Sequence, residues 1–159
     1  MSLEKAREHL AKYGKEKDII LFDQSSATVK EAAADLGTEE GRIAKTMSFL
    51  LSSGPIVIVA AGDGKIDNRK FKDTFHEKAK MIGPEDVEHL TGHPVGGVCP
   101  FGVNDDVKVY LDESLKRFDY VYPAAGTPNS AIKLTISELE ETSEFTAWID
   151  VTKLLSSQA

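Results

Sequence analysis

Lys45 stands where a strand-like pattern would place an apolar side chain. In the stretch "GRIAKTMSFLLS", residues 41 to 52, Lys45 shares one side of an extended chain with Met47 and Phe49. Its ammonium group can reach water along the apolar stem. It can also lie at the rim of a pocket and bind a carboxyl, carbonyl or phosphate oxygen. The pattern alone leaves both interpretations open.

A second segment with chemical potential is "GHPVGGVCPFG", residues 92 to 102, which contains four glycines and two prolines. Glycines allow positive φ and close backbone approach, and Pro100 fixes φ, so the segment is typical of a shaped loop. Such a loop can point backbone N–H groups at an ester carbonyl or at the oxyanion formed from it. The alternative is a connection whose glycines only serve tight turns. Neither the dinucleotide fingerprint nor the Walker spacing is present, so we expect no nucleotide cofactor.

Cys99 and His93 lie in the same segment and suggest a thiol nucleophile with its base. Such a pair needs hydrogen-bond contact and usually a third, orienting group, and a six-residue separation guarantees neither, so we do not favour this interpretation. The other histidines lack metal-ligand spacing, and one cysteine is too few for a structural zinc. We therefore expect no metal. These histidines are His9, His76 and His89.

Basic residues gather between positions 65 and 80, although the whole chain is acidic. The formal net charge is −7 and the pI is about 5.1, so the average field repels nucleic acid and any nucleic-acid contact must be local. A solvated helix face is the simplest interpretation of the basic stretch. Its members are Lys65, Arg69, Lys70, Lys72, Lys78 and Lys80.

Composition indicates one soluble globular unit. The 159 residues are 41% hydrophobic and 28% charged, which suits a single domain over residues 1–159. The first residues have no signal-peptide pattern, and no stretch approaches the roughly 20 apolar residues of a membrane span. The single cysteine fits a reducing compartment. We expect a cytoplasmic protein without membrane contact.

Periodicity and turn residues predict the elements that must position these groups. A helix is expected at the start, ending at Gly14, followed by a short strand in "DIILF". The stretch "TVKEAAADLG" has a capping box, Thr28 with Glu31, and predicts a helix that closes at Gly37. The Lys45 segment and "PIVIVAAGDGK" predict two strands paired as a hairpin.

The second half of the chain has two predicted helices and then mostly strands. One helix begins after Asp67, and the other spans "GPEDVEHLTG". Short strands are expected in "VKVYLDESL", "YVYPAAG", "SAIKLT" and "FTAWIDV", with a capped helical turn in "SELEETS" before the last. Strands come in clusters rather than alternating with helices. The predicted fold class is therefore α/β with a mixed, largely antiparallel sheet, curled toward a barrel and flanked by helices.

Five motifs together carry a resemblance to a known family. "TVKEAAADLG", "GRIAKTMSFL", "GGVCPFG", "VYLDESL" and "AAG…IKL", in this order, resemble the YbaK-type family of free-standing prolyl-tRNA editing deacylases, which is related to the editing insertion of bacterial prolyl-tRNA synthetases. The resemblance covers roughly residues 20 to 155. It implies a mixed α/β fold on a curled sheet, without metal or cofactor. The implied activity is hydrolysis of the ester between a wrong amino acid and the terminal adenosine of a tRNA.

The resemblance also assigns site residues. Lys45 matches the lysine of the family's "KT" pair and Gly97 lies in its G-x-x-x-P loop, so these two are the expected catalytic positions. The loop backbone is expected to hold the substrate carbonyl and a ribose hydroxyl, so no protein nucleophile is needed. The expected substrate-binding residues are Thr46, Gly96, Val98, Cys99, Pro100, Phe22, Thr28 and Gly126.

Departures from the family pattern leave the substrate open. Ala124 and Ala131 stand where the cysteine-removing branch has a serine and an aspartate, and Cys99 replaces a serine of many relatives and is expected in the pocket wall. The amino acid removed is left open among alanine, serine, threonine and cysteine. The expected partner is the acceptor end of tRNA, with a synthetase or the 65–80 stretch adding selectivity. A non-catalytic module that binds tRNA or a synthetase is the alternative.

Overall fold

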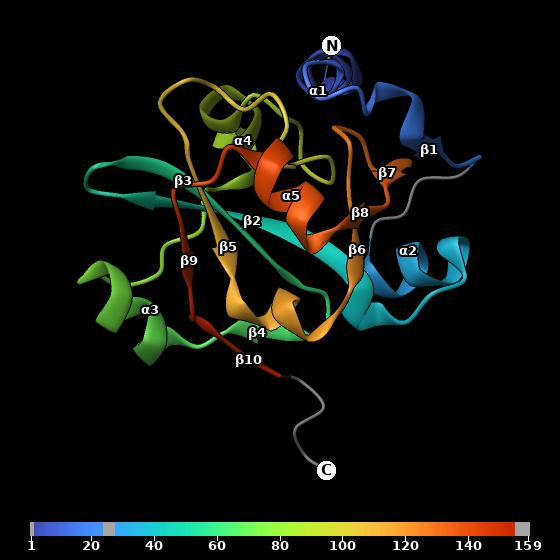
Figure 1. Ribbon diagram of the computed structural model, residues 1–159. Coiled ribbons are helices and arrows are strands. Elements are labelled where there is room, and N and C mark those ends of the chain that lie inside the picture. The colour runs from blue at the N-terminus through green and yellow to red at the C-terminus, as the bar shows by residue number, and fades with distance from the viewer. Residues whose placement is uncertain (1, 24–27, 155–159) are drawn as a thin grey trace.

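The computed structural model describes residues 2–23 and 28–154 (Figure 1). The α-helices of this part of the chain are α1 (Ser2–Ala11), α2 (Val29–Leu36), α3 (Asn68–Phe75), α4 (Pro84–Thr91) and α5 (Ile136–Ser143). The strands are β1 (Ile19–Leu21), β2 (Ile43–Leu51), β3 (Gly54–Ala61), β4 (Gly64–Ile66), β5 (Lys108–Asp112), β6 (Tyr120–Pro123), β7 (Ser130–Ile132), β8 (Leu134–Thr135), β9 (Ala147–Ile149) and β10 (Thr152–Leu154).

The main sheet has six strands in the order β8-β6-β2-β3-β5-β9. Pairing is antiparallel between β8 and β6 and between β2 and β3, and parallel at the other three junctions. Two further antiparallel pairs, β1 with β7 and β10 with β4, form separate two-stranded sheets. The predicted mixed α/β fold on a curled sheet with flanking helices is confirmed.

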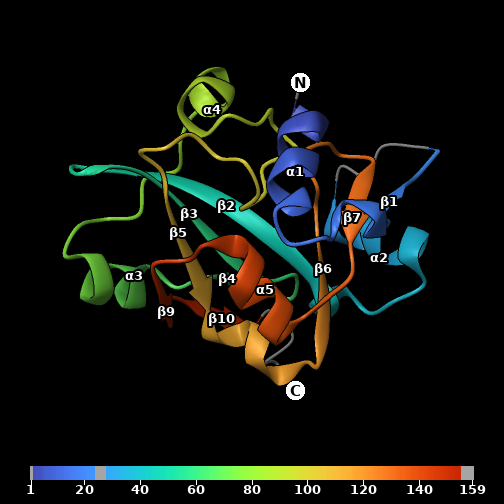
Figure 2. The same cartoon turned by 45° about the horizontal axis from the view of Figure 1, so that its top comes forward.

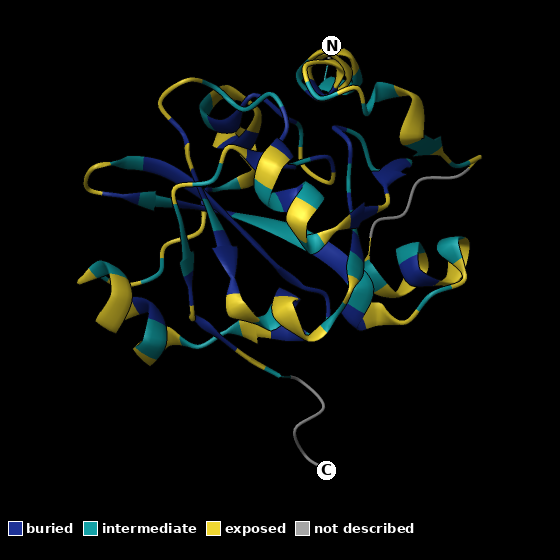
Figure 3. Cartoon of the chain, viewed as in Figure 1, coloured by how far each residue is buried: buried dark blue, intermediate teal, exposed yellow. Residues whose placement is uncertain are grey.

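Both faces of the β2–β3 hairpin are covered, which is why β3 reads as a continuous apolar run (Figure 3). On one face Val57 and Val59 pack with residues of α1, α5 and the segment after Gly97. On the other face Phe49 and Ile58 pack with Phe71 of α3. Figures 1 and 2 show α3 far from α1 and α2, which lie toward the other end of the molecule.

Local sequence signals set the helix ends as predicted. Thr28 and Glu31 form the capping box of α2, and Gly37 ends that helix in the left-handed conformation with φ 67°. Asp67 caps α3 by accepting bonds from two backbone N–H groups, and Pro84 begins α4. The predicted hairpin of β2 and β3 is confirmed, and its register places Leu51 opposite Gly54.

Two features were not anticipated. Strands β4 and β10 pair over only three residues each, too short for a recognisable alternation. The segment "SELEETS", expected as a helical turn, is part of the eight-residue helix α5, which begins at Ile136 and whose capping box is formed by Thr135 and Glu138. Thr135 lies at the end of a predicted strand, and it serves as strand end and helix cap at once.

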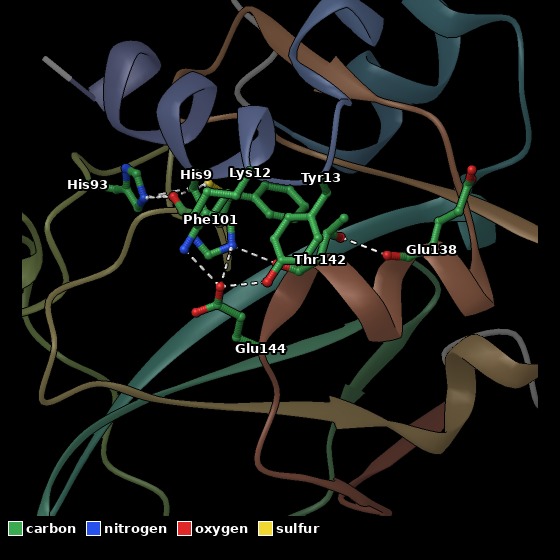
Figure 4. A network of polar contacts seen from close by, with 9 residues as sticks. His9, Lys12, Tyr13, His93, Phe101, Glu138, Thr142 and Glu144 are labelled. Atoms are coloured by element: carbon green, nitrogen blue, oxygen red, sulfur yellow. Dashed lines mark hydrogen bonds and ion pairs between the residues drawn. The ribbon is translucent and has the colours of Figure 1, made fainter.

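Helix α1 is joined to the C-terminal end of α5 by a polar network (Figure 4). His9 Nε2 donates to the carbonyl of Thr142 at 2.6 Å. Tyr13 and Lys12 both donate to Glu144 Oε2, at 2.7 and 2.9 Å. Glu144 itself lies in the left-handed region with φ 53°, which a non-glycine residue adopts only at a cost. Its carboxylate contacts compensate for that cost and fasten α1 to the core.

This network makes a testable contribution to acid stability. The bond from Lys12 and then that from Tyr13 lower the pKa of Glu144, while the same contact raises the pKa of Tyr13 to about 12. Because the folded pKa of Glu144 lies below its ordinary value of 4.5, its stabilisation is complete above pH 4.5 and is lost as pH falls through the folded value. We expect Glu144→Gln to lower the free energy of unfolding at pH 7 by about 0.5 to 1 kcal/mol, since the pair is partly exposed.

Urea unfolding between pH 7 and pH 3 measures this contribution. The difference between wild type and Glu144→Gln is expected to shrink as the pH falls. Glu8→Gln, an exposed change of the same charge on α1, is the matched control. A constant difference at all pH values would contradict the assignment.

Candidate functional site

A cavity of about 400 Å³ opens beside β2. Six consecutive residues of β2, 43 to 48, line it. Because neighbouring side chains of a strand point to opposite faces, a cavity lined by all of them runs along the edge of the strand rather than over one face. The other lining residues come from just after the end of β1, from α2 and its N-cap, from the stretch 81–87, from the glycine-rich loop and from positions 122–131. They are Phe22, Thr28, Val29, Ala32, Leu36, Met81, Ile82, Pro84, Val87, Val95, Gly96, Val98, Tyr122, Ala124, Thr127, Pro128, Ser130 and Ala131.

Six of the residues singled out from the sequence line this one cavity. Lys45 and Thr46 enter it from β2, while the glycine-rich loop contributes two of its members. The set is Phe22, Thr28, Lys45, Thr46, Gly96 and Val98. Lys45 and the loop therefore both border the same cavity beside β2.

The other four singled-out residues lie behind the cavity wall. A Cβ atom on Gly97 would collide with the carbonyl oxygen of Gly126, and Gly126, with φ 100°, packs in turn against the backbone of Ser2. Cys99, expected in the wall, is instead completely buried in the core, and Pro100 lines a separate polar cavity beside α1. Gly97 and Gly126 therefore hold two backbone segments in close contact and set the position of the loop.

The contact at Gly97 gives the first prediction about activity. Gly97→Ala is expected to push the loop away from Gly126, to lower the free energy of unfolding by about 1 to 3 kcal/mol and to reduce turnover. Gly64→Ala is the matched control, because like Gly97 it does not need a left-handed φ and its added methyl group would meet no atom closer than 3.4 Å. Urea unfolding and single-turnover rates measure both effects. A Gly97→Ala variant no worse than Gly64→Ala would contradict the packing role.

Lys45 is half-buried, and its Nζ atom donates to the carbonyl of Gly64 in β4. Burial lowers the pKa of Lys45, and the nearby charge of Asp63 opposes that shift. Asp63 itself pairs with Arg117, Oδ1 to Nη2 at 2.6 Å, so it lies between two cations. Within the described residues, the ammonium group thus donates to one neutral carbonyl, and the acid whose charge acts on it is already paired with Arg117.

The electrostatics of the cavity follow from its lining. Among the described residues that line it, Lys45 is the one charged side chain, and aspartate and glutamate are absent. Most of the wall is apolar, so charges inside interact more strongly than in water. Thr46 adds an unused polar group, because its Oγ1 is buried without a hydrogen-bond partner in the described structure. Such a cavity suits a neutral ester and favours negative charge that develops on it.

Cys99 and His93 do meet, but in an arrangement that does not activate the thiol. His93 Nε2 lies 3.6 Å from Cys99 Sγ and 2.6 Å from the carbonyl oxygen of Phe101. A carbonyl can only accept, so the hydrogen-bond network assigns the proton to Nε2, while Nδ1 accepts from the hydroxyl of Ser2 at 2.5 Å. Burial raises the pKa of Cys99 to about 12. The ring cannot take the thiol proton, and Cys99 is a core residue.

Sequence reasoning missed much of the cavity wall. Ala32 and Leu36 of α2 point into it, and their spacing of four residues was a usable sign of an inward face. Met81 and Val95 are each 61% exposed at its border, and no local pattern marked them. The described residues contain no group of three or more potential metal ligands. In that same part of the chain, the helices are too short and too polar to cross a membrane.

A curled mixed sheet with a lysine and a glycine-rich loop at one edge cavity defines a class of small α/β editing domains. The chain belongs to the family of the aminoacyl-tRNA editing domain, whose model matches residues 23–142. A solved structure titled "Crystal structure of a putative trans-editing enzyme for prolyl tRNA synthetase" superimposes with a TM-score of 0.86 and 29% identity, covering 96% of this chain and 97% of that chain.

Two curated relatives match most of this chain. "Uncharacterized protein YwhH" of Bacillus subtilis is 51% identical over 154 residues, which is 96% of this chain and 98% of the relative. The "Putative Cys-tRNA(Pro)/Cys-tRNA(Cys) deacylase EbsC" of Enterococcus faecalis is 30% identical over 115 residues, which is 71% of this chain and 70% of the relative. The resemblance inferred from the five motifs is confirmed.

Proposed function

We propose that this protein is an aminoacyl-tRNA deacylase that acts in trans on mischarged tRNA, as one domain over residues 1–159 in the cytoplasm. The observation that carries the proposal is the shared cavity: Lys45, Thr46 and the loop residues Gly96 and Val98 line one apolar space without an acidic side chain. The family and the names of the relatives support the reaction class.

The reaction needs no protein nucleophile. Water adds to the ester carbonyl, the bond between the carbonyl carbon and the ribose oxygen breaks, and that oxygen takes a proton, so that a free amino acid and a free tRNA result. Negative charge develops on the carbonyl oxygen during the addition. The Lys45 ammonium group and N–H groups of the loop stabilise that charge in a site where water does not screen it.

The amino acid removed is proposed to be small. The cavity of about 400 Å³ must hold the ester together with part of the terminal adenosine, which limits the space for a side chain. Ala124 and Ala131 line it and offer no polar group to a substrate side chain. Alanine, serine, threonine and cysteine fit this description, and a larger residue is excluded by size.

Recognition of the tRNA is proposed to be limited to its acceptor end. The net charge of −7 disfavours broad phosphate contact. The basic stretch at 65–80 or a partner synthetase supplies selectivity for the tRNA body, with tRNA for proline as the first candidate. Binding of free tRNA is expected to be weak and to weaken further with salt.

The test is a deacylation panel of tRNAs charged with alanine, serine, threonine or cysteine, each compared with its spontaneous hydrolysis. Release of at least one amino acid by the wild type, faster than from correctly charged prolyl-tRNA, is the expected result. Binding of these tRNAs without release of any amino acid would favour the non-catalytic module instead.

A further inference from the structure

Within the described structure, backbone pairing along the β2 edge that faces the cavity is missing at one residue. Next to β6, pairing with β2 stops at Ala44, which lies opposite Pro123. Farther along, the backbone of residues 80–82 bonds to the same edge: Leu50 N–H donates to Lys80, and Ile82 N–H donates to Ser48. Thr46 lies between these two partners.

The register shows which way the Thr46 backbone points. In a strand, the N–H and C=O of one residue point to the same side, and those of the next residue point to the other. Leu51 closes the two-residue hairpin opposite Gly54, and the odd residues therefore bond to β3. Ser48 and Leu50 point away from β3, and Thr46 must do so too. Within the described structure, no strand or loop pairs with its N–H and C=O.

An aminoacyl ester carries the hydrogen-bonding groups that one residue of a neighbouring strand would present to this open position. Its carbonyl oxygen accepts, and its α-ammonium group donates, with the spacing that one residue of a neighbouring strand would have. We propose that Thr46 binds the aminoacyl group as a one-residue strand addition: its N–H donates to the ester carbonyl, and its C=O accepts from the α-ammonium group. This inference rests on the proposed deacylase function and specifies what the site recognises.

The rest of the cavity supports this assignment of the α-ammonium group. Positive charge is usually bound by carboxylates, and the described lining contains none. Among the neighbouring acceptors, Ser130 Oγ already bonds with Thr127 and with the N–H of Ala125. The unpaired Oγ1 of Thr46 is the side-chain alternative. The Thr46 carbonyl is a strong acceptor without a ladder partner. Recognition through it favours the charged α-ammonium group, because an N-acylated ester keeps one N–H donor but loses the charge and adds bulk beside β2.

The experiment compares each aminoacyl-tRNA of the panel with two modified forms. Nitrous acid treatment gives the 2-hydroxyacyl-tRNA, lactyl-tRNA in the case of alanine, which keeps the size but loses the charge. Acetylation gives the N-acetyl form. For each ester, the kcat/KM of the enzyme is divided by the rate of hydroxide hydrolysis, which removes the difference in intrinsic reactivity. We expect a decrease of about tenfold or more for lactyl-tRNA, since a charge-assisted hydrogen bond becomes a neutral one. The decrease should be larger for N-acetylalanyl-tRNA, because it loses the same charge and must also fit the acetyl group.

Thr46→Val separates the backbone from the side chain, because it removes Oγ1 and keeps the N–H and C=O. Its rates are expected to fall on both esters while their ratio stays at the wild-type value. Equal normalised rates on alanyl- and lactyl-tRNA in the wild type would overturn the inference and leave the deacylase function intact. If Thr46→Val hydrolysed alanyl- and lactyl-tRNA at equal normalised rates, recognition of the α-ammonium group would be assigned to the hydroxyl group. That result would also overturn the inference. Hydrolysis of none of the esters would remove the proposed function itself.

Discussion

Lys45→Ala is expected to lower the rate of deacylation by about 100-fold or more while the protein remains folded. The ammonium group is the one charge that the described cavity lining offers to a developing oxyanion, and removal of a single such donor typically costs this much. Single-turnover hydrolysis of the best substrate in the panel measures the effect. The stability of the fold is expected to be nearly unchanged, because Lys45 is half-buried with a lowered pKa and its amine bonds to one carbonyl.

Lys108→Ala is the matched control for this experiment. Lys108 is an exposed lysine on β5 of the same sheet, outside the cavity, and its removal changes the net charge equally. The two variants should bind free tRNA with similar salt dependence but differ in turnover. Equal activity of Lys45→Ala and Lys108→Ala would reject a catalytic role for position 45.

The largest loss of stability is expected for Asp112→Ala. Asp112 is completely buried at the end of β5, and its carboxylate accepts from three donors: the N–H groups of Ser114 and Val151 and the hydroxyl of Thr152, at 2.9, 2.8 and 2.7 Å. Without the carboxylate, these donors are buried and unpaired. The free energy of unfolding should fall by about 3 to 5 kcal/mol.

Urea unfolding at pH 7 measures that loss. Asp112→Asn keeps one acceptor oxygen and should lose less than Asp112→Ala, while Asp73→Ala on the exposed face of α3 should change little. The C-terminal strand β10 should also exchange its amide hydrogens faster in Asp112→Ala, because Val151 and Thr152 lead into it. If the amide hydrogens of β10 exchanged as slowly in Asp112→Ala as in the wild type, the carboxylate would not be the group that anchors β10.

The sequence predicted best the elements whose signals are local. The capping box of Thr28 and the glycine at position 37 are set by the backbone preferences of a few neighbouring residues, and each is found where expected. The predicted pairing of the two following strands as a hairpin is also found. Asp112 also behaves as such a signal, since an acid in a turn is more often a cap than a base, and here it caps the turn at Ser114.

The site was less predictable because long-range packing decides it. The "KT" pair identified the strand, but not that Lys45 and Thr46 lie on opposite faces and share an edge cavity. Close contact of Gly97 with Gly126, 29 positions later, is invisible to a local pattern and removes both residues from the cavity lining. Cys99 similarly lies in the core because the loop turns its side chain inward.

The edge cavity is built from segments that span residues 22 to 131, and its far wall is the last to be synthesised. A nascent chain that still lacks residues 122 to 131 has Lys45 but no enclosed space around it. The proposed ester cleavage should therefore require the chain through residue 131, because a shorter chain lacks the wall that faces Lys45.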